Sequence, residues 1–172
     1  MRFHARAFVL AVLLCWLIPV EIAGDDTCLA GSYVLNEKAS DDVMKAFEPA
    51  LAEMSPLTRS IARRRLRRQA QPEARLRIDL AHDAVTISSG DRPAMTLPSN
   101  GEKVDMSIED GTGRFSANIV DGVLRVRMEA DDGGYTHEYS LDPDGRRLTL
   151  NVSVSFDRLP RPVSYQLAYD RT

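Results

Sequence analysis

Glycine turns recur through the second half of the chain at a nearly constant interval, and this interval strongly constrains the fold. From residue 90 onward, six glycines of the 172-residue chain are spaced 10 to 12 residues apart. Five of them complete an Asn-Gly or Asp-Gly pair: Asn100-Gly101, Asp110-Gly111, Asp121-Gly122, Asp132-Gly133 and Asp144-Gly145. Such pairs supply the positive φ that tight hairpin turns require. The sequence therefore predicts an antiparallel meander that forms a sandwich or a barrel.

The segments between these turns alternate apolar and polar residues, as half-buried strands do. With similar segments nearer the N-terminus, ten strands are predicted, over 30–36, 75–81, 84–89, 92–97, 103–108, 113–119, 122–129, 134–141, 146–156 and 162–170. Most are shorter than the roughly 9–11 residues of a membrane-spanning strand, and their polar faces are rich in Arg and Asp. We therefore expect a mainly β, ten-stranded antiparallel up-and-down barrel with an apolar interior. Closure of the sheet would remove its exposed edges.

Residues 41–69 interrupt the strand pattern with apolar residues at helical spacing. Two helices are predicted, over about 41–53 and 56–69, inserted after the first strand. Ser40 is the expected N-cap of the first helix, and Ser55, followed by Pro56, that of the second. The apolar stripe of this helical pair needs a partner, and we expect the pair to cover the open end of the barrel.

The first 24 residues have the layout of a secretory signal peptide, with a basic start, an apolar run over 7–20 and small residues near Ala23. A retained anchor is the alternative, although the run is short for a membrane-spanning helix. We expect residues 25–172 to form a single secreted or periplasmic barrel domain. Cys28 would be its one cysteine, either as a buried small residue or as a contact for another thiol.

Two segments carry a family resemblance: residues 31–35 read GSYVL, and residues 40–47 read SDDVMKAF. They are similar to the entry of the intracellular lipid-binding (fatty-acid-binding) proteins, and the last strand, YQLAYDR over 165–171, resembles their final strand. The Gly-x-aromatic start is shared with the lipocalins. The resemblance covers the topology of most of the chain after the leader, and it implies a ten-stranded barrel, a helical pair and a hydrophobic ligand.

The departures from that family bear on the ligand. The carboxylate-binding Arg-x-Tyr of its last strand would align with Leu167-Ala168-Tyr169, so the tyrosine is present and the arginine is not. Tyr33 stands where tryptophan is usual, and the second helix is longer and more basic. A signal peptide is also foreign to these cytosolic proteins. The chain thus resembles a secreted bacterial barrel of this shape, without the fatty-acid carboxylate clamp.

Strand parity identifies the candidate ligand-binding residues. The inward positions of the strands over 134–141 and 162–170 bring four tyrosines and a histidine to the apolar face: Tyr135, His137, Tyr139, Tyr165 and Tyr169. Buried Tyr and His side chains need hydrogen-bond partners. They could bond to one another or to buried water, or they could orient the polar head of a ligand in an apolar cavity.

Arginines dominate residues 59–77, which hold eight of them and one glutamate. On a helical wheel Arg63, Arg64, Arg67 and Arg68 share a face. This basic patch could contact an anionic membrane surface, or it could complement the C-terminus of its own helix and pair with acidic groups of the barrel. A secreted chain makes nucleic acid a poor partner for it.

The sequence predicts no catalytic residues, no metal site and no cofactor. It has no Cys/His cluster, no phosphate-binding loop and no nucleotide fingerprint, and its acidic pairs adjoin turns or a helix start. Three functions stay open: a carrier of an apolar small molecule or lipid, a packed barrel that serves as an envelope or protein-interaction module, and an enzyme on the same fold. The first is the expected function, because it uses the inward-facing polar residues.

Overall fold

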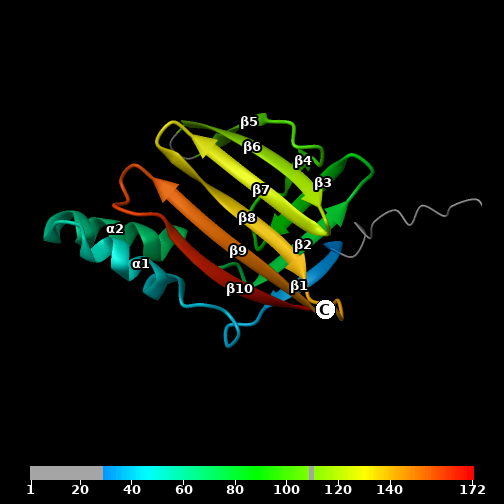
Figure 1. The fold of residues 1–172 in the computed structure, drawn as a ribbon, viewed down its shortest axis with the longest axis horizontal. Coiled ribbons are helices and arrows are strands. Elements are labelled where there is room, and N and C mark those ends of the chain that lie inside the picture. The colour runs from blue at the N-terminus through cyan, green and yellow to red at the C-terminus, as the bar shows by residue number, and fades with distance from the viewer. Residues whose placement is uncertain (1–28, 109–110) are drawn as a thin grey trace, which may run out of the picture.

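The computed structural model describes residues 29–108 and 111–172, and these form one ten-stranded antiparallel sheet with a helical pair (Figure 1). The strands are β1 Gly31–Leu35, β2 Arg75–Leu80, β3 Ala84–Ser89, β4 Met95–Pro98, β5 Val104–Ile108, β6 Gly111–Val120, β7 Val123–Ala130, β8 Gly133–Leu141, β9 Arg147–Phe156 and β10 Val163–Arg171. The predicted fold is confirmed. The predicted leader and Cys28 lie outside the described residues.

The sheet curls into a nearly closed barrel. Its order is β4-β3-β2-β1-β10-β9-β8-β7-β6-β5, so pairing between β1 and β10 joins the first and last strands of the chain. Asp121 and Gly122 both have positive φ, 52° and 74°, between β6 and β7. The Asp-Gly signal therefore marks a tight hairpin there, as predicted.

Closure is incomplete, which corrects two expectations. Strands β4 and β5 do not pair and remain edges of the sheet, and Asn100-Gly101 is not a hairpin turn. Instead Asn100 bridges to Asn118 of β6, and the Gly101 amide donates to the Ala117 carbonyl at 2.8 Å. The positive φ of Gly101, 86°, lies where the chain, after β4, joins the edge of β6 that β5 then follows.

Strand β4 is shorter than predicted, because it begins at Met95 and not at residue 92. The Arg92 amide donates to the Ser89 carbonyl at 3.1 Å, so residues 91–94 belong to the turn after β3. Pro93 lies in this turn and has no amide proton to give to a strand pair.

Apolar side chains from all parts of the sheet meet in one core. Fully buried members come from opposite sides of the barrel, for example Ile78, Val85, Leu124, Val126 and Leu148. The described residues include no buried charged side chain. The inward and outward parity predicted from the sequence therefore holds along strands such as β2, β7 and the first part of β9.

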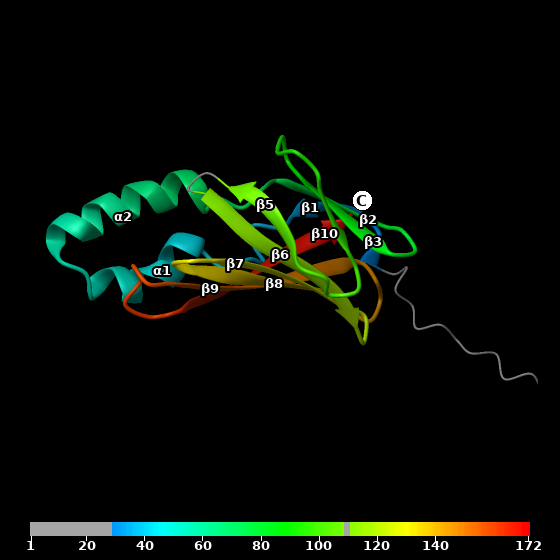
Figure 2. The ribbon, with the colours of Figure 1, turned by 90° about the horizontal axis from the view of Figure 1, so that it is seen from above.

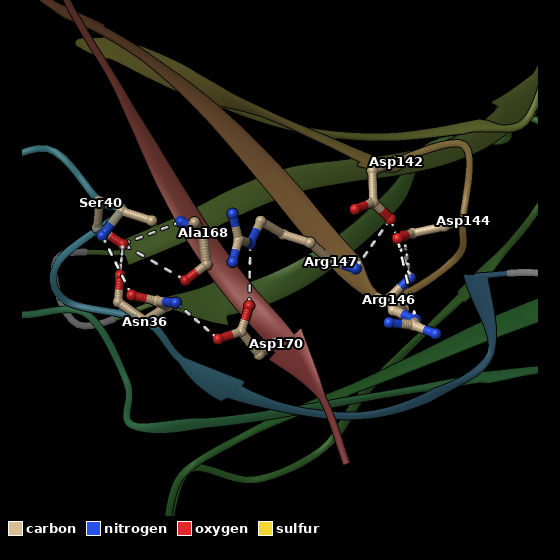
Figure 3. Close-up of polar contacts among 9 residues, drawn as sticks. Asn36, Ser40, Asp142, Asp144, Arg146, Arg147, Ala168 and Asp170 are labelled. Carbon is tan, nitrogen blue, oxygen red and sulfur yellow. Dashed lines mark hydrogen bonds and ion pairs between the residues drawn. The ribbon is translucent and has the colours of Figure 1, made fainter.

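Two helices follow β1: α1 Val43–Ala52 and α2 Pro56–Gln69. The N-cap of α1 is Asp42, whose carboxylate accepts from the Lys45 amide, and not Ser40 as predicted. The Ser40 hydroxyl instead donates to the Asn36 carbonyl at 2.8 Å and accepts from the Ala168 amide at 2.9 Å, so it ties the chain to β10 (Figure 3). Ser55 caps α2 ahead of Pro56, as predicted.

The two helices pack differently against the barrel. Val43, Phe47, Ala50 and Leu51 of α1 are buried, and α1 lies against β10. The helices lie at the end of the barrel where β9 turns into β10, and α2 projects beyond the sheet (Figures 1 and 2). None of the described helices is both long enough and apolar enough to cross a lipid bilayer.

Acidic residues near the opposite end of the barrel stabilise turns and strand ends (Figure 3). Asp142 accepts from the backbone amides of Arg146 and Arg147, both at 2.9 Å, and these bonds help to lower the pKa of its carboxyl group. Asp170 pairs with the Arg147 guanidinium at 2.9 Å and accepts from Asn36. These acidic groups therefore have structural partners in the turn after β8 and in β10.

Candidate functional site

The inward-facing polar residues come from β8 and β10, which flank β9. His137 of β8 and Tyr165 of β10 both stand opposite Val152, one on each side of it. Tyr135 stands opposite Val154 in the next inward row. Strand pairing thus brings together side chains that are nearly 30 residues apart in the sequence.

Three of these side chains form a stack along β8. The rings of Tyr135 and His137 lie with their centroids 4.5 Å apart and their planes at 28°. Tyr139 meets His137 edge-on, with centroids 6.1 Å apart and a Tyr139 hydroxyl to His137 Nδ1 distance of 3.4 Å. Positions two residues apart on a strand share one face, and this spacing permits the stack.

Several polar atoms of this group have no protein partner. The Tyr169 hydroxyl donates to the Glu73 carbonyl at 3.3 Å, and the Tyr139 hydroxyl faces His137. Within residues 29–108 and 111–172, no hydrogen bond is made by the Tyr135 hydroxyl, the Tyr165 hydroxyl or His137 Nε2. These three atoms are not sealed off, because Arg63 Nε is the one fully buried and unpartnered side-chain polar atom in that part of the chain. They are therefore accessible to water or to a ligand.

The surroundings keep the group uncharged near neutral pH. Burial lowers the pKa of His137 to about 4, because the apolar interior disfavours the imidazolium. Burial likewise raises the pKa of Tyr139 above its ordinary range and that of Tyr169 to about 12. The site therefore offers hydroxyl groups and a neutral imidazole.

An open hollow of about 390 Å³ lies at the end of β7, β8 and β9. Its lining includes Met128, Tyr135 and Val154 together with Thr136 and Pro162. Phe47 of α1 approaches the other side of the group, with its ring centroid 6.2 Å from that of Tyr165. The inward polar residues thus lie near the end of the barrel that the helices cover.

Glu73 and Arg92 form an ion pair that was not predicted from the sequence, with Oε1 and Nε 2.7 Å apart. Arg92 is close enough to Tyr135 to oppose the rise that burial causes in the tyrosine's pKa, and Glu73 helps to raise the pKa of Tyr169. The pair therefore stands beside the interior tyrosines. The sequence contained a signal for this pair. Glu73 and Arg92 are equally far along the chain from the turn between β2 and β3, so the register of these two strands, continued beyond their ends, places them opposite each other.

The basic patch of α2 is only partly free. Arg63 pairs with Glu48 of α1 at 2.6 Å and is partly buried, so this member of the predicted basic patch already has an acidic partner. Arg64, Arg67 and Arg68 are exposed and form no ion pair with any other described residue. With Ser60 and Arg63 they line a second hollow of about 390 Å³.

No three His, Cys, Asp or Glu side chains in the described part of the chain are grouped closely enough to hold a metal ion. The inward-facing polar groups are tyrosine hydroxyls and one imidazole set among apolar side chains.

Several solved structures share this architecture. The SAHS (secretory abundant heat soluble) protein of Ramazzottius varieornatus is 13% identical, with a TM-score of 0.59 over 84% of this chain and 96% of that one. Fatty-acid-binding protein 1 of Echinococcus granulosus is 14% identical, with a TM-score of 0.55 over 85% and 98%. The chain has the fold of the fatty-acid-binding proteins.

A third similar structure contains a ligand. It is the fatty-acid-binding protein of Schistosoma mansoni in complex with arachidonic acid, 17% identical with a TM-score of 0.53 over 87% of this chain and 99% of that one. Neither a protein-family model nor a curated protein matches the sequence. At these identities the likeness establishes the fold, and the residues of the site must support the function.

Proposed function

We propose that this chain binds an apolar small molecule or lipid inside its barrel. The observation that carries the proposal is the set of three accessible, unpartnered polar atoms in an apolar interior: the hydroxyls of Tyr135 and Tyr165, and Nε2 of His137. These atoms need a hydrogen-bond partner, and a ligand head group that displaces water would supply one. The arachidonic acid complex of the Schistosoma mansoni protein supports the use of this fold for such ligands.

We further propose that the protein works as a binding protein outside the cytoplasm, in the periplasm or medium of a bacterium. The basis is the predicted leader over 1–24, whose removal would leave residues 25–172 as the working domain. A carrier role needs no catalytic residue, and His137 has no serine or cysteine nucleophile among its hydrogen-bond contacts in the described chain.

Native mass spectrometry of the purified protein tests the binding function. We expect a co-purified apolar molecule, or a one-to-one complex after addition of the neutral fluorescent probe N-phenyl-1-naphthylamine. The expected increase in probe fluorescence should saturate with protein concentration. A protein that carries no molecule and does not bind the probe would favour the packed envelope or protein-interaction module.

The outer face of α2 favours a second role, contact with an anionic membrane surface. Leu57 and Ile61 are 74% and 58% exposed, and they are followed one to two turns later by the unpaired Arg64, Arg67 and Arg68. An exposed apolar edge beside basic residues is the pattern by which helices lie on anionic lipid. Such contact would bring the barrel end next to the source of a lipid ligand.

Charge reversal tests this contact. We expect replacement of Arg64, Arg67 and Arg68 by glutamate to reduce binding to phosphatidylglycerol-containing vesicles by more than about tenfold, since each basic residue near such a surface contributes about 1 kcal/mol. Vesicle co-sedimentation at low salt measures the effect. The matched control reverses three exposed arginines away from α2, namely Arg75, Arg127 and Arg146, for the same change in net charge. Equal losses of vesicle binding in both variants would show that the overall charge of the protein, and not the position of the arginines on α2, determines the binding.

A further inference from the structure

The charge distribution of the barrel restricts the chemistry of the ligand head. The described residues include no buried charged side chain, and the arginines of β6 and β7, namely Arg114, Arg125 and Arg127, are exposed on the outer face. Arg171 has the inward parity of β10 but lies six residues beyond Tyr165, at the opposite end of the barrel. There it is exposed, and its guanidinium donates to the Gly145 carbonyl at 3.1 Å. Arg127 lines the open hollow together with Tyr135, but Glu129 lines it as well, so that hollow holds one basic and one acidic side chain.

The groups that do face this space are neutral hydrogen-bonding groups. A tyrosine hydroxyl donates one hydrogen bond and accepts others, and a neutral imidazole nitrogen accepts or donates according to its tautomer. His137 stays neutral because burial lowers its pKa to about 4. A head group that both donates and accepts, such as an alcohol, could satisfy a tyrosine and the imidazole together.

The ion pair of Arg92 with Glu73 does not add a net charge to the surroundings of the interior tyrosines. Arg92 and Glu73 stand beside the interior tyrosines as an ion pair at 2.7 Å, so they present no net charge. A carboxylate ligand that approached Arg92 would also meet the carboxylate of Glu73. A buried carboxylate without a cationic partner is costly, because it loses its hydration without a compensating charge.

We propose that the barrel selects amphiphiles with an uncharged polar head, such as a long-chain alcohol, aldehyde or ester, over the corresponding free carboxylate. This proposal rests on the binding function proposed above and adds the class of ligand. The hydroxyls of Tyr135 and Tyr165 and Nε2 of His137 are the groups that recognise the head, while the apolar walls hold the chain.

A matched pair of ligands tests the selection. 1-Dodecanol and dodecanoate have the same chain length, and at about pH 8 the acid is fully ionised. We expect dodecanol to displace N-phenyl-1-naphthylamine at a concentration at least about tenfold lower than dodecanoate. Equal displacement by both, or stronger displacement by dodecanoate, would overturn the selection while leaving the binding function in place. If neither compound nor the probe binds, the binding function itself fails.

A double variant tests the recognition groups. Tyr135→Phe combined with Tyr165→Phe keeps both rings and removes both unpartnered hydroxyls. We expect its affinity for dodecanol to fall about fivefold or more relative to its affinity for the neutral probe, because the probe depends mainly on the apolar walls. Unchanged affinity for dodecanol in a variant that still binds the probe would show that these hydroxyls do not recognise the head.

Discussion

Acidification from about pH 7 to about pH 4 is expected to destabilise the wild-type protein by about 3 kcal/mol more than the variant His137→Gln. In the folded protein, burial holds the pKa of His137 at about 4, against 6.5 for an ordinary histidine. The unfolded chain therefore binds one more proton than the folded chain in the interval between these values. Stability must then fall as the pH drops through this interval and level off below it.

Urea unfolding at the two pH values measures this difference. Glutamine cannot titrate and keeps a polar group near the Tyr139 hydroxyl, so the variant isolates the proton on the imidazole. His82 and the carboxylates are present in both proteins, and their contributions cancel. The same acid sensitivity in both proteins would mean that solvent reaches the His137 ring as freely as it reaches a surface residue.

The variant Val154→Phe is expected to reduce probe and ligand affinity by at least about tenfold. Val154 is partly buried, faces inward, and stands between Tyr135 of β8 and Val163 of β10. A larger ring at this position would occupy space beside the unpartnered hydroxyls. Titration with N-phenyl-1-naphthylamine measures the loss.

The control for this variant is Asn151→Phe, which adds an aromatic ring on the outer face of the same strand, where Asn151 is exposed. We expect its probe affinity to match that of the wild type. Overpacking by Val154→Phe costs about 1–3 kcal/mol of stability, so circular dichroism must show that the variant is folded. If Val154→Phe is folded and binds the probe as tightly as the wild type does, the ligand does not bind beside Val154.

Much of the fold could be predicted because strands and tight turns are local signals. The alternation of β9, and Asp-Gly at 121–122, depend on neighbouring residues alone, and both predictions are confirmed. The alternation along β8 also predicted that His137 faces inward, without any knowledge of the strands that pair with β8. Turn and alternation rules together therefore predicted the ten strands and the antiparallel pairing of consecutive strands, except at β4 and β5.

The errors concern contacts that local signals do not contain. Asn100-Gly101 has the residues of a hairpin, but the chain crosses to β6, because tertiary packing fixed the position of β4 and β5. Ser40 and Asp42 are both good caps, and the contact of Ser40 with β10 decided between them. The accessible hydroxyls of Tyr135 and Tyr165 could not be predicted either, since partner atoms depend on the whole assembled interior.

The unpaired boundary between β4 and β5 makes the barrel mechanically anisotropic. Separation of any two paired strands breaks a ladder, such as the nine register pairs between β8 and β9. Widening at the β4–β5 boundary would strain the bridge of Asn100 with Asn118 and the hydrogen bond from the Gly101 amide to the Ala117 carbonyl, but it would break no ladder between β4 and β5. Opening of the wall along this line therefore requires fewer broken strand pairs than opening between β8 and β9.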